Sequence, residues 1–136
     1  MTRCLDTNVI VDVINGKGPE IRQRYQEVLA GNQHVVVSSL TVHELVYGAL
    51  ISRRPDHHMG EVRTLLAQLD AVEWSDRDAY SAARIRARLE QTGQMIGHLD
   101  ALIAGQALER GWTLVTANTR EFSRIDDLVL EDWSIA

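Results

Sequence analysis

The chain has 136 residues, of which 45% are hydrophobic and 24% charged. This length suits one domain with a single core, and the composition is that of a folded protein rather than a disordered one. The formal net charge of −5 does not attract nucleic acid, which argues against a simple DNA- or RNA-binding module and less strongly against an enzyme whose acidic site is neutralised by cations.

The N-terminal quarter of the chain alternates between short apolar runs and helical patterns. Residues 2–5 predict an apolar strand, and residues 8–15 suit a first helix that a glycine terminates. A second helix has Pro19 in its first turn and ends at Gly31. The β-branched run at residues 34–38 is too short for a helix and predicts a buried strand.

The next stretch predicts two helices separated by a loop. Apolar residues at helical spacing run through residues 40–54, and Pro55 ends this helix. The polar residues 56–58, two of them histidines, are interpreted as a solvated loop. Apolar residues then repeat at helical spacing through residues 62–69, which marks another helix.

The C-terminal half continues the alternation. Residues 71–74 predict a strand, and a capping-box pattern opens a long helix at residues 75–91. A helix at residues 98–110 is followed by strands at residues 113–116 and 128–131. Short, continuously apolar strands between helices are typical of a buried parallel sheet. We therefore predict an α/β fold with three layers, in which helices flank a short central parallel sheet.

The N-terminus and the cysteine content bear on the location of the protein. The first apolar run is interrupted by Asp6, Asn8 and Asp12, and no run approaches the roughly 20 apolar residues that span a bilayer. We interpret the N-terminus as mature structure rather than a signal peptide, and expect a cytoplasmic location with no membrane association. Cys4 is the only cysteine, so an intramolecular disulfide and a cysteine-based metal site are excluded.

Polar residues fall where the predicted strands end. From distant parts of the chain, six share this placement: Asp6, Glu44, Asp100, Thr116, Asn118 and Glu121. Because ligands bind beyond the carboxyl ends of parallel strands, we expect these residues to converge. Carboxylates close together repel one another, and a hard divalent cation with oxygen ligands relieves that repulsion. Mg²⁺ is the expected ion, with Mn²⁺ as a substitute, and the lack of histidine or cysteine argues against zinc.

Each of these residues also has an ordinary structural explanation. Asp6 could cap the helix that follows it. Glu44 and Asp100 could complement the positive ends of helices, and Asn118 could be a turn residue. Their joint placement at the strand ends favours a functional site over these separate explanations.

Four segments and the C-terminal end resemble the motifs of VapC-type PIN-domain toxins. The segments are LDTNVIVD at 5–12, SSLTVHELVYGA at 38–49, GHLDALIAGQA at 97–107, LVTANTREFSRI at 114–125 and LVLEDW at 128–133. The resemblance covers nearly the whole chain, and the order and spacing of four motifs make it specific. It implies a single PIN domain over residues 1–136.

The resemblance also implies a set of site residues. Asp6, Glu44 and Asp100 would bind Mg²⁺ or Mn²⁺, and they and Asn118 would be catalytic. The supporting residues would be Thr7, Asn8, Thr116 and Glu121. Many PIN domains carry a fourth acid where this chain has Asn118, which keeps an oxygen but lacks the charge, and Glu121 is the candidate to supply that charge.

The function that the resemblance implies is that of a metal-dependent endoribonuclease, the toxin of a type II toxin–antitoxin pair. The expected partners are an RNA substrate, with tRNA as the favoured class, and a cognate VapB-type antitoxin. A homodimer and a toxin–antitoxin hetero-oligomer are also expected. The alternative is a non-catalytic PIN-like domain that binds RNA or protein. A receiver-like phosphoryl-transfer domain fits less well, because Lys17 is the only lysine and lies far from the last strand.

Overall fold

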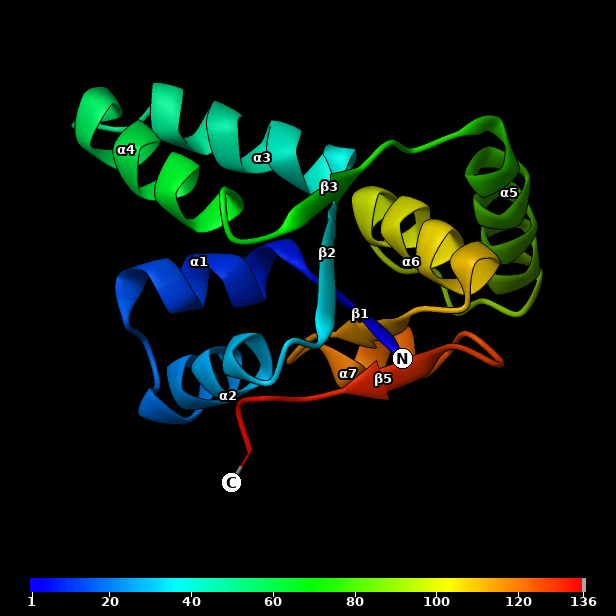
Figure 1. Ribbon diagram of the computed structural model, residues 1–136. Coiled ribbons are helices and arrows are strands. Elements are labelled where there is room, and N and C mark those ends of the chain that lie inside the picture. The colour runs from blue at the N-terminus through cyan, green and yellow to red at the C-terminus, as the bar shows by residue number, and fades with distance from the viewer. Residues whose placement is uncertain (136) are drawn as a thin grey trace.

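The computed structural model describes residues 1–135, and its five strands form one parallel sheet in the order β3-β2-β1-β4-β5 (Figure 1). The strands are β1 (Thr2–Leu5), β2 (His34–Ser38), β3 (Asp70–Val72), β4 (Thr113–Val115) and β5 (Val129–Glu131). The parallel α/β architecture predicted from the sequence is confirmed.

Helices cover both faces of the sheet. They are α1 (Thr7–Asn15), α2 (Pro19–Ala30), α3 (Ser39–Leu50), α4 (Pro55–Leu66), α5 (Asp76–Gln91), α6 (His98–Arg110) and α7 (Thr119–Phe122). In Figure 1, α1 to α4 lie on one side of the sheet, and α5 and α6 lie on the other. None of these helices is long and apolar enough to cross a membrane, as far as residues 1–135 show.

Each central strand serves two separate cores, because successive side chains of a strand point to opposite faces. Leu5, Val37 and Val115 pack with α1, α2, α3 and α4 in one core. Their sequence neighbours Cys4, Val36 and Leu114 pack with α5, α6 and α7 in the other. This burial on both faces explains why apolar residues stand next to one another in the central strands rather than at every second position.

The helices α5 and α6 approach each other closely at Gly105. A Cβ atom there would lie 2.6 Å from the backbone N and Cα atoms of Ala82 on α5. Only a residue without a side chain fits at this crossing, so Gly105 allows the backbones of α5 and α6 to pack directly against each other.

The structure corrects two of the predicted helix boundaries. The helix predicted over residues 40–54 ends at Leu50, and Pro55 starts α4 instead of ending α3. Proline suits the first helical position, where its missing N–H would have no helical partner. Residues 56–58 are therefore helical and not a loop.

The remaining differences concern short elements. The strand predicted over residues 71–74 spans Asp70–Val72, and the short helix α7 was not predicted. The helix predicted over residues 62–69 is α4, which begins earlier, at Pro55, and ends at Leu66. The other elements agree with the predictions to within one or two residues at each end.

The strand order places a switch point between β1 and β4. The chain runs from β1 to β2 and β3 in one direction, and later adds β4 and β5 on the other side of β1. In open parallel sheets, ligands bind beyond the carboxyl ends of the strands at such a point. The segments that leave β1 and β4 are held side by side there, since the Asp6 N–H donates to the Val115 carbonyl at 2.9 Å.

Candidate active site

Asp6 lies at the switch point, directly after β1 and before α1. One of its carboxylate oxygens accepts the Thr7 backbone N–H at 2.8 Å, which caps α1, and the other accepts the Thr116 hydroxyl at 2.9 Å. The residue is only 3% exposed. Burial raises the pKa of Asp6, and the two hydrogen bonds oppose that rise without cancelling it.

The segment after β4 continues this network. The Thr116 hydroxyl accepts the Asn118 backbone N–H at 3.0 Å, and the Asn118 side-chain amide donates to Glu121 Oε2 at 2.9 Å. Asn118 precedes the short helix α7, which carries Glu121 in its first turn. A continuous set of hydrogen bonds therefore links Asp6 to Glu121.

Asp100 approaches the same place from the first turn of α6. A Cβ atom on Gly97 would lie 3.0 Å from Asp100 Oδ2, so the glycine leaves room for the carboxylate to fold back over the helix start. The pKa of Asp100 is raised to about 6 by burial first, and then by the negative charges of Asp6 and Glu121. These three carboxylates are thus close enough to interact electrostatically.

No basic side chain offsets these charges in the described part of the chain. The ion pairs within residues 1–135 include none that involves Asp6, Asp100 or Glu121. The three carboxylates are more widely spaced than direct ligands of one fully enclosed ion, because they form no group with all ligand atoms within 4.8 Å of one another. An oxygen-only, uncompensated set of this kind fits Mg²⁺ or Mn²⁺, which keep several waters.

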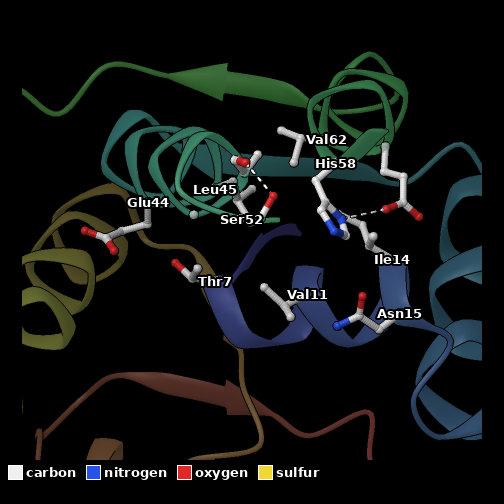
Figure 2. Close-up of a pocket in the computed structure, with 12 residues that line it drawn as sticks. Thr7, Val11, Ile14, Asn15, Glu44, Leu45, Ser52, His58 and Val62 are labelled. Atoms are coloured by element: carbon white, nitrogen blue, oxygen red, sulfur yellow. Dashed lines mark hydrogen bonds and ion pairs between the residues drawn. The ribbon is translucent and has the colours of Figure 1, made fainter. Parts of the chain in front are cut away.

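Glu44 reaches the region from α3, across a groove between α1, α3 and α4. It lines this groove with Thr7, and Figure 2 shows the two side chains at one end of it. The Glu44 carboxylate lies 3.6 Å from the ring nitrogen of His43, and no hydrogen bond or ion pair joins it to Asp6 or Asp100 within residues 1–135. Glu44 thus lies beside Thr7, the residue that follows Asp6, and is not among the charges that raise the pKa of Asp100.

The two remaining supporting residues differ in role. The Thr7 hydroxyl donates to the Thr41 hydroxyl at 3.1 Å and thereby ties α1 to α3. Asn8 is exposed in the first turn of α1. Thr7 therefore contributes to the shape of the groove, whereas Asn8 faces solvent.

A second group of possible metal ligands was missed from the sequence. His57, His58 and Glu61 bring three ligand atoms within 4.8 Å of one another on α4. The sequence prediction treated residues 56–58 as a loop, which gives no reason for their side chains to meet Glu61. In a helix that starts at Pro55, residues three and four apart share one face, so the three side chains lie together.

Comparison with known proteins gives consistent matches over nearly the whole chain. The family model described as PIN domain matches residues 3–128. The chain is 35% identical over 130 residues to the tRNA(fMet)-specific endonuclease VapC of Shigella flexneri, covering 96% of both chains. It is 37% identical over 133 residues to ribonuclease VapC2 of Rickettsia felis, covering 98% of both.

Solved structures agree with this result. The fold matches VapBC2 from Rickettsia felis bound to a DNA fragment from its promoter, with a TM-score of 0.91 and 32% identity, covering 98% of this chain and 99% of the other. It also matches DNA-bound VapBC from Salmonella typhimurium, with a TM-score of 0.89 and 34% identity over 98% of each chain.

Proposed function

Because this chain belongs to the PIN-domain family, and within it to the VapC ribonucleases, we propose that it is the toxin of a type II toxin–antitoxin pair and cleaves RNA as a metal-dependent endoribonuclease. The observation that carries this proposal is the set of three interacting carboxylates without a basic partner at the switch point of the sheet. The sequence similarity to a tRNA(fMet)-specific endonuclease favours tRNA as the substrate class.

The residues divide into ligands and positioning groups. Asp6 and Asp100 would hold the main cation, and Thr116 fixes the orientation of the Asp6 carboxylate through its 2.9 Å hydrogen bond. Glu121 supplies the fourth acid in place of Asn118, which holds it by a hydrogen bond from its amide. Glu44, which lines the groove beside Thr7, would orient the attacking water or bind a further cation.

Asp6 and Asp100 would hold a divalent cation, which would supply the acidity that activates a water and would offset the charge on the phosphate. The chain supplies the geometry for this chemistry. Asp6 is buried and held by two hydrogen bonds, so its carboxylate is oriented before any substrate binds. In-line attack by water on the phosphodiester would leave a 5′-phosphate and a 3′-hydroxyl.

The partners follow from the same resemblance. The solved neighbours are VapBC complexes, so we propose a VapB-type antitoxin as the partner and a toxin–antitoxin hetero-oligomer built on a homodimer of this chain. A single PIN domain over residues 1–136 remains part of this proposal, since the family model covers residues 3–128.

The decisive test is cleavage of RNA by the purified chain. We expect initiator tRNA to be cut when Mg²⁺ or Mn²⁺ is present, with 5′-phosphate ends, and to stay intact in excess chelator. Asp100→Asn should lower the rate by about 100-fold or more, since loss of a metal ligand exceeds the effect of losing a supporting residue.

The matched control is Asp70→Asn. Asp70 is an exposed aspartate at the opposite end of the sheet, where it pairs with His34, and its substitution should leave the rate unchanged. Undiminished cleavage in chelator would refute the metal-dependent mechanism. Binding of RNA without cleavage under any condition would favour a non-catalytic PIN-like domain.

A further inference from the structure

The first two turns of α4 gather nitrogen and oxygen ligands at one point. His57 Nε2 lies 3.4 Å and His58 Nδ1 lies 3.2 Å from the same oxygen, Glu61 Oε1. All three ligand atoms lie within 4.8 Å of one another. The group therefore converges on a single position rather than forming separate pairs.

The helical spacing explains this convergence. Glu61 is four residues from His57 and three from His58, so its carboxylate falls between the two rings on one helix face. The two imidazole rings are 5.2 Å apart and lie edge to face. Pro55 starts α4 two residues before His57, so both rings stand on the first turn of an ordered helix.

The distances match the coordination of a transition metal. Ligands about 2.1 Å from a tetrahedral ion lie about 3.4 Å from one another. The two nitrogen-to-oxygen separations, 3.4 and 3.2 Å, are close to this value. Imidazole nitrogen suits Zn²⁺ and related ions of its row, whereas Mg²⁺ prefers oxygen ligands alone.

We infer that His57, His58 and Glu61 form a second metal site, selective for Zn²⁺ or a similar transition-metal ion and distinct from the acidic site at the strand ends. Three protein ligands leave one position open to water or to another ligand, as in zinc sites that are not purely structural. This inference does not rest on the nuclease assignment.

The position of the site gives it access to the groove. His58 and Glu61 line the groove that has Glu44 at its other end, and Figure 2 shows His58 far from Glu44 and beside Ile14 of α1. All three side chains of the site remain between one third and one half exposed. An ion can thus reach the site without any opening of the core.

The test is titration of the full chain with Zn²⁺, followed by calorimetry. An Asp6→Asn, Asp100→Asn background removes the competing acidic site. We expect one saturable Zn²⁺ site that excess Mg²⁺ does not displace. His57→Gln and Glu61→Gln should each weaken Zn²⁺ binding by about tenfold or more.

The matched control is His34→Gln. His34 also pairs with a carboxylate, that of Asp70 at 2.8 Å, but has no third ligand in the described chain. Its substitution should leave Zn²⁺ affinity unchanged. The inference would be overturned if His34→Gln and His57→Gln lowered the Zn²⁺ affinity equally. It would also be overturned if His57→Gln and Glu61→Gln left the Zn²⁺ affinity unchanged.

A measurement on the unsubstituted His57–His58–Glu61 group makes the result independent of variant folding. Zinc should shift the imidazole ¹⁵N resonances of His57 and His58, and should leave those of His34 and His98 in place. Absence of any shift at the two α4 histidines at saturating Zn²⁺ would overturn the inference on its own.

Discussion

At the scale of single residues, Asp100 combines a proposed metal-binding role with an electrostatic cost. Burial and the charges of Asp6 and Glu121 raise its pKa to about 6. In chelator at pH 7.5, Asp100→Asn should therefore be more stable than the parent, by about 1 kcal/mol or about 3 °C in Tm. Asp6→Asn should gain less, because Asp6 accepts two hydrogen bonds that an amide cannot fully replace. Thermal melts with chelator and with Mg²⁺ measure the Tm of the parent and of both variants. Mg²⁺ should reduce the Tm difference between variant and parent, because the parent binds Mg²⁺ more tightly. Lower melting of Asp100→Asn in chelator, unaffected by Mg²⁺, would show that Asp100 only complements the α6 terminus.

The same carboxyl group gives the metal-free protein a pH dependence of known sign. The pKa of Asp100 is raised from its ordinary 3.8 to about 6 in the folded state. At pH values between 3.8 and about 6, the folded chain therefore holds a proton that the unfolded chain has released. Folding stability should therefore rise as the pH falls from 7.5 to 5. Asp78 and Glu131 have lowered pKa values and act in the opposite sense, but in a more acidic range. Thermal melts at pH 5 and 7.5 should show that the Tm difference between Asp100→Asn and the parent is smaller at pH 5. A Tm difference that is the same at both pH values would contradict the raised pKa of Asp100.

The strand-end rule led us to expect the site residues near one another, but it does not give their contacts. Asp6 and Thr116 directly follow parallel strands, so their meeting follows from this rule. How Glu121 comes close enough to raise the pKa of Asp100 depends on α7, a four-residue helix without a periodic pattern, which the sequence did not predict. The bonding of Asn118 to Glu121 was likewise outside what spacing alone could give.

At the scale of elements, the α5–α6 contact depends on one glycine. An added methyl group at Gly105 would meet the α5 backbone at 2.6 Å, so Gly105→Ala should destabilise the fold by about 1–3 kcal/mol. Gly48 on α3 is a matched control, since nothing lies within 4 Å of its Cβ position. Gly48→Ala should instead stabilise by about 0.5–1 kcal/mol, because alanine favours the helix. Urea unfolding of both variants measures these changes, and equal effects at the two sites would contradict the close-packing explanation.

The element boundaries that sequence reasoning missed share a physical cause. A proline after a helical pattern either ends one helix or begins the next, and residue patterns around Pro55 do not separate these cases. Here the chain turns at residues 51–54 and restarts immediately. Long helices with clear start and stop residues, such as α5 and α6, were predicted to within a residue.

At the scale of the whole molecule, the strand order brings acidic residues that are distant in the sequence close together in space. Apolar strands alternating with helices predicted a parallel sheet, and a parallel sheet puts all carboxyl ends at one edge. The order of strands could not be derived from the sequence. It is the placement of β4 beside β1 that joins residues 110 positions apart, Asp6 and Thr116, in one hydrogen bond.

The proposed role of the whole molecule as a toxin predicts its effect in a living cell. Expression of the chain alone in a bacterial host should arrest growth, because cleavage of tRNA stops translation. The Asp100→Asn variant, expressed to the same level, should not arrest growth, since it keeps the fold but loses the carboxylate that would hold the cation. A small protein encoded next to this chain should relieve the arrest and co-purify with it, as expected for a VapB-type antitoxin. Growth curves with matched protein levels on immunoblots decide the outcome. Harmless expression of chain that still cleaves tRNA in vitro would refute the toxin role while leaving the nuclease assignment intact, whereas arrest by both the parent and Asp100→Asn would separate toxicity from the acidic site.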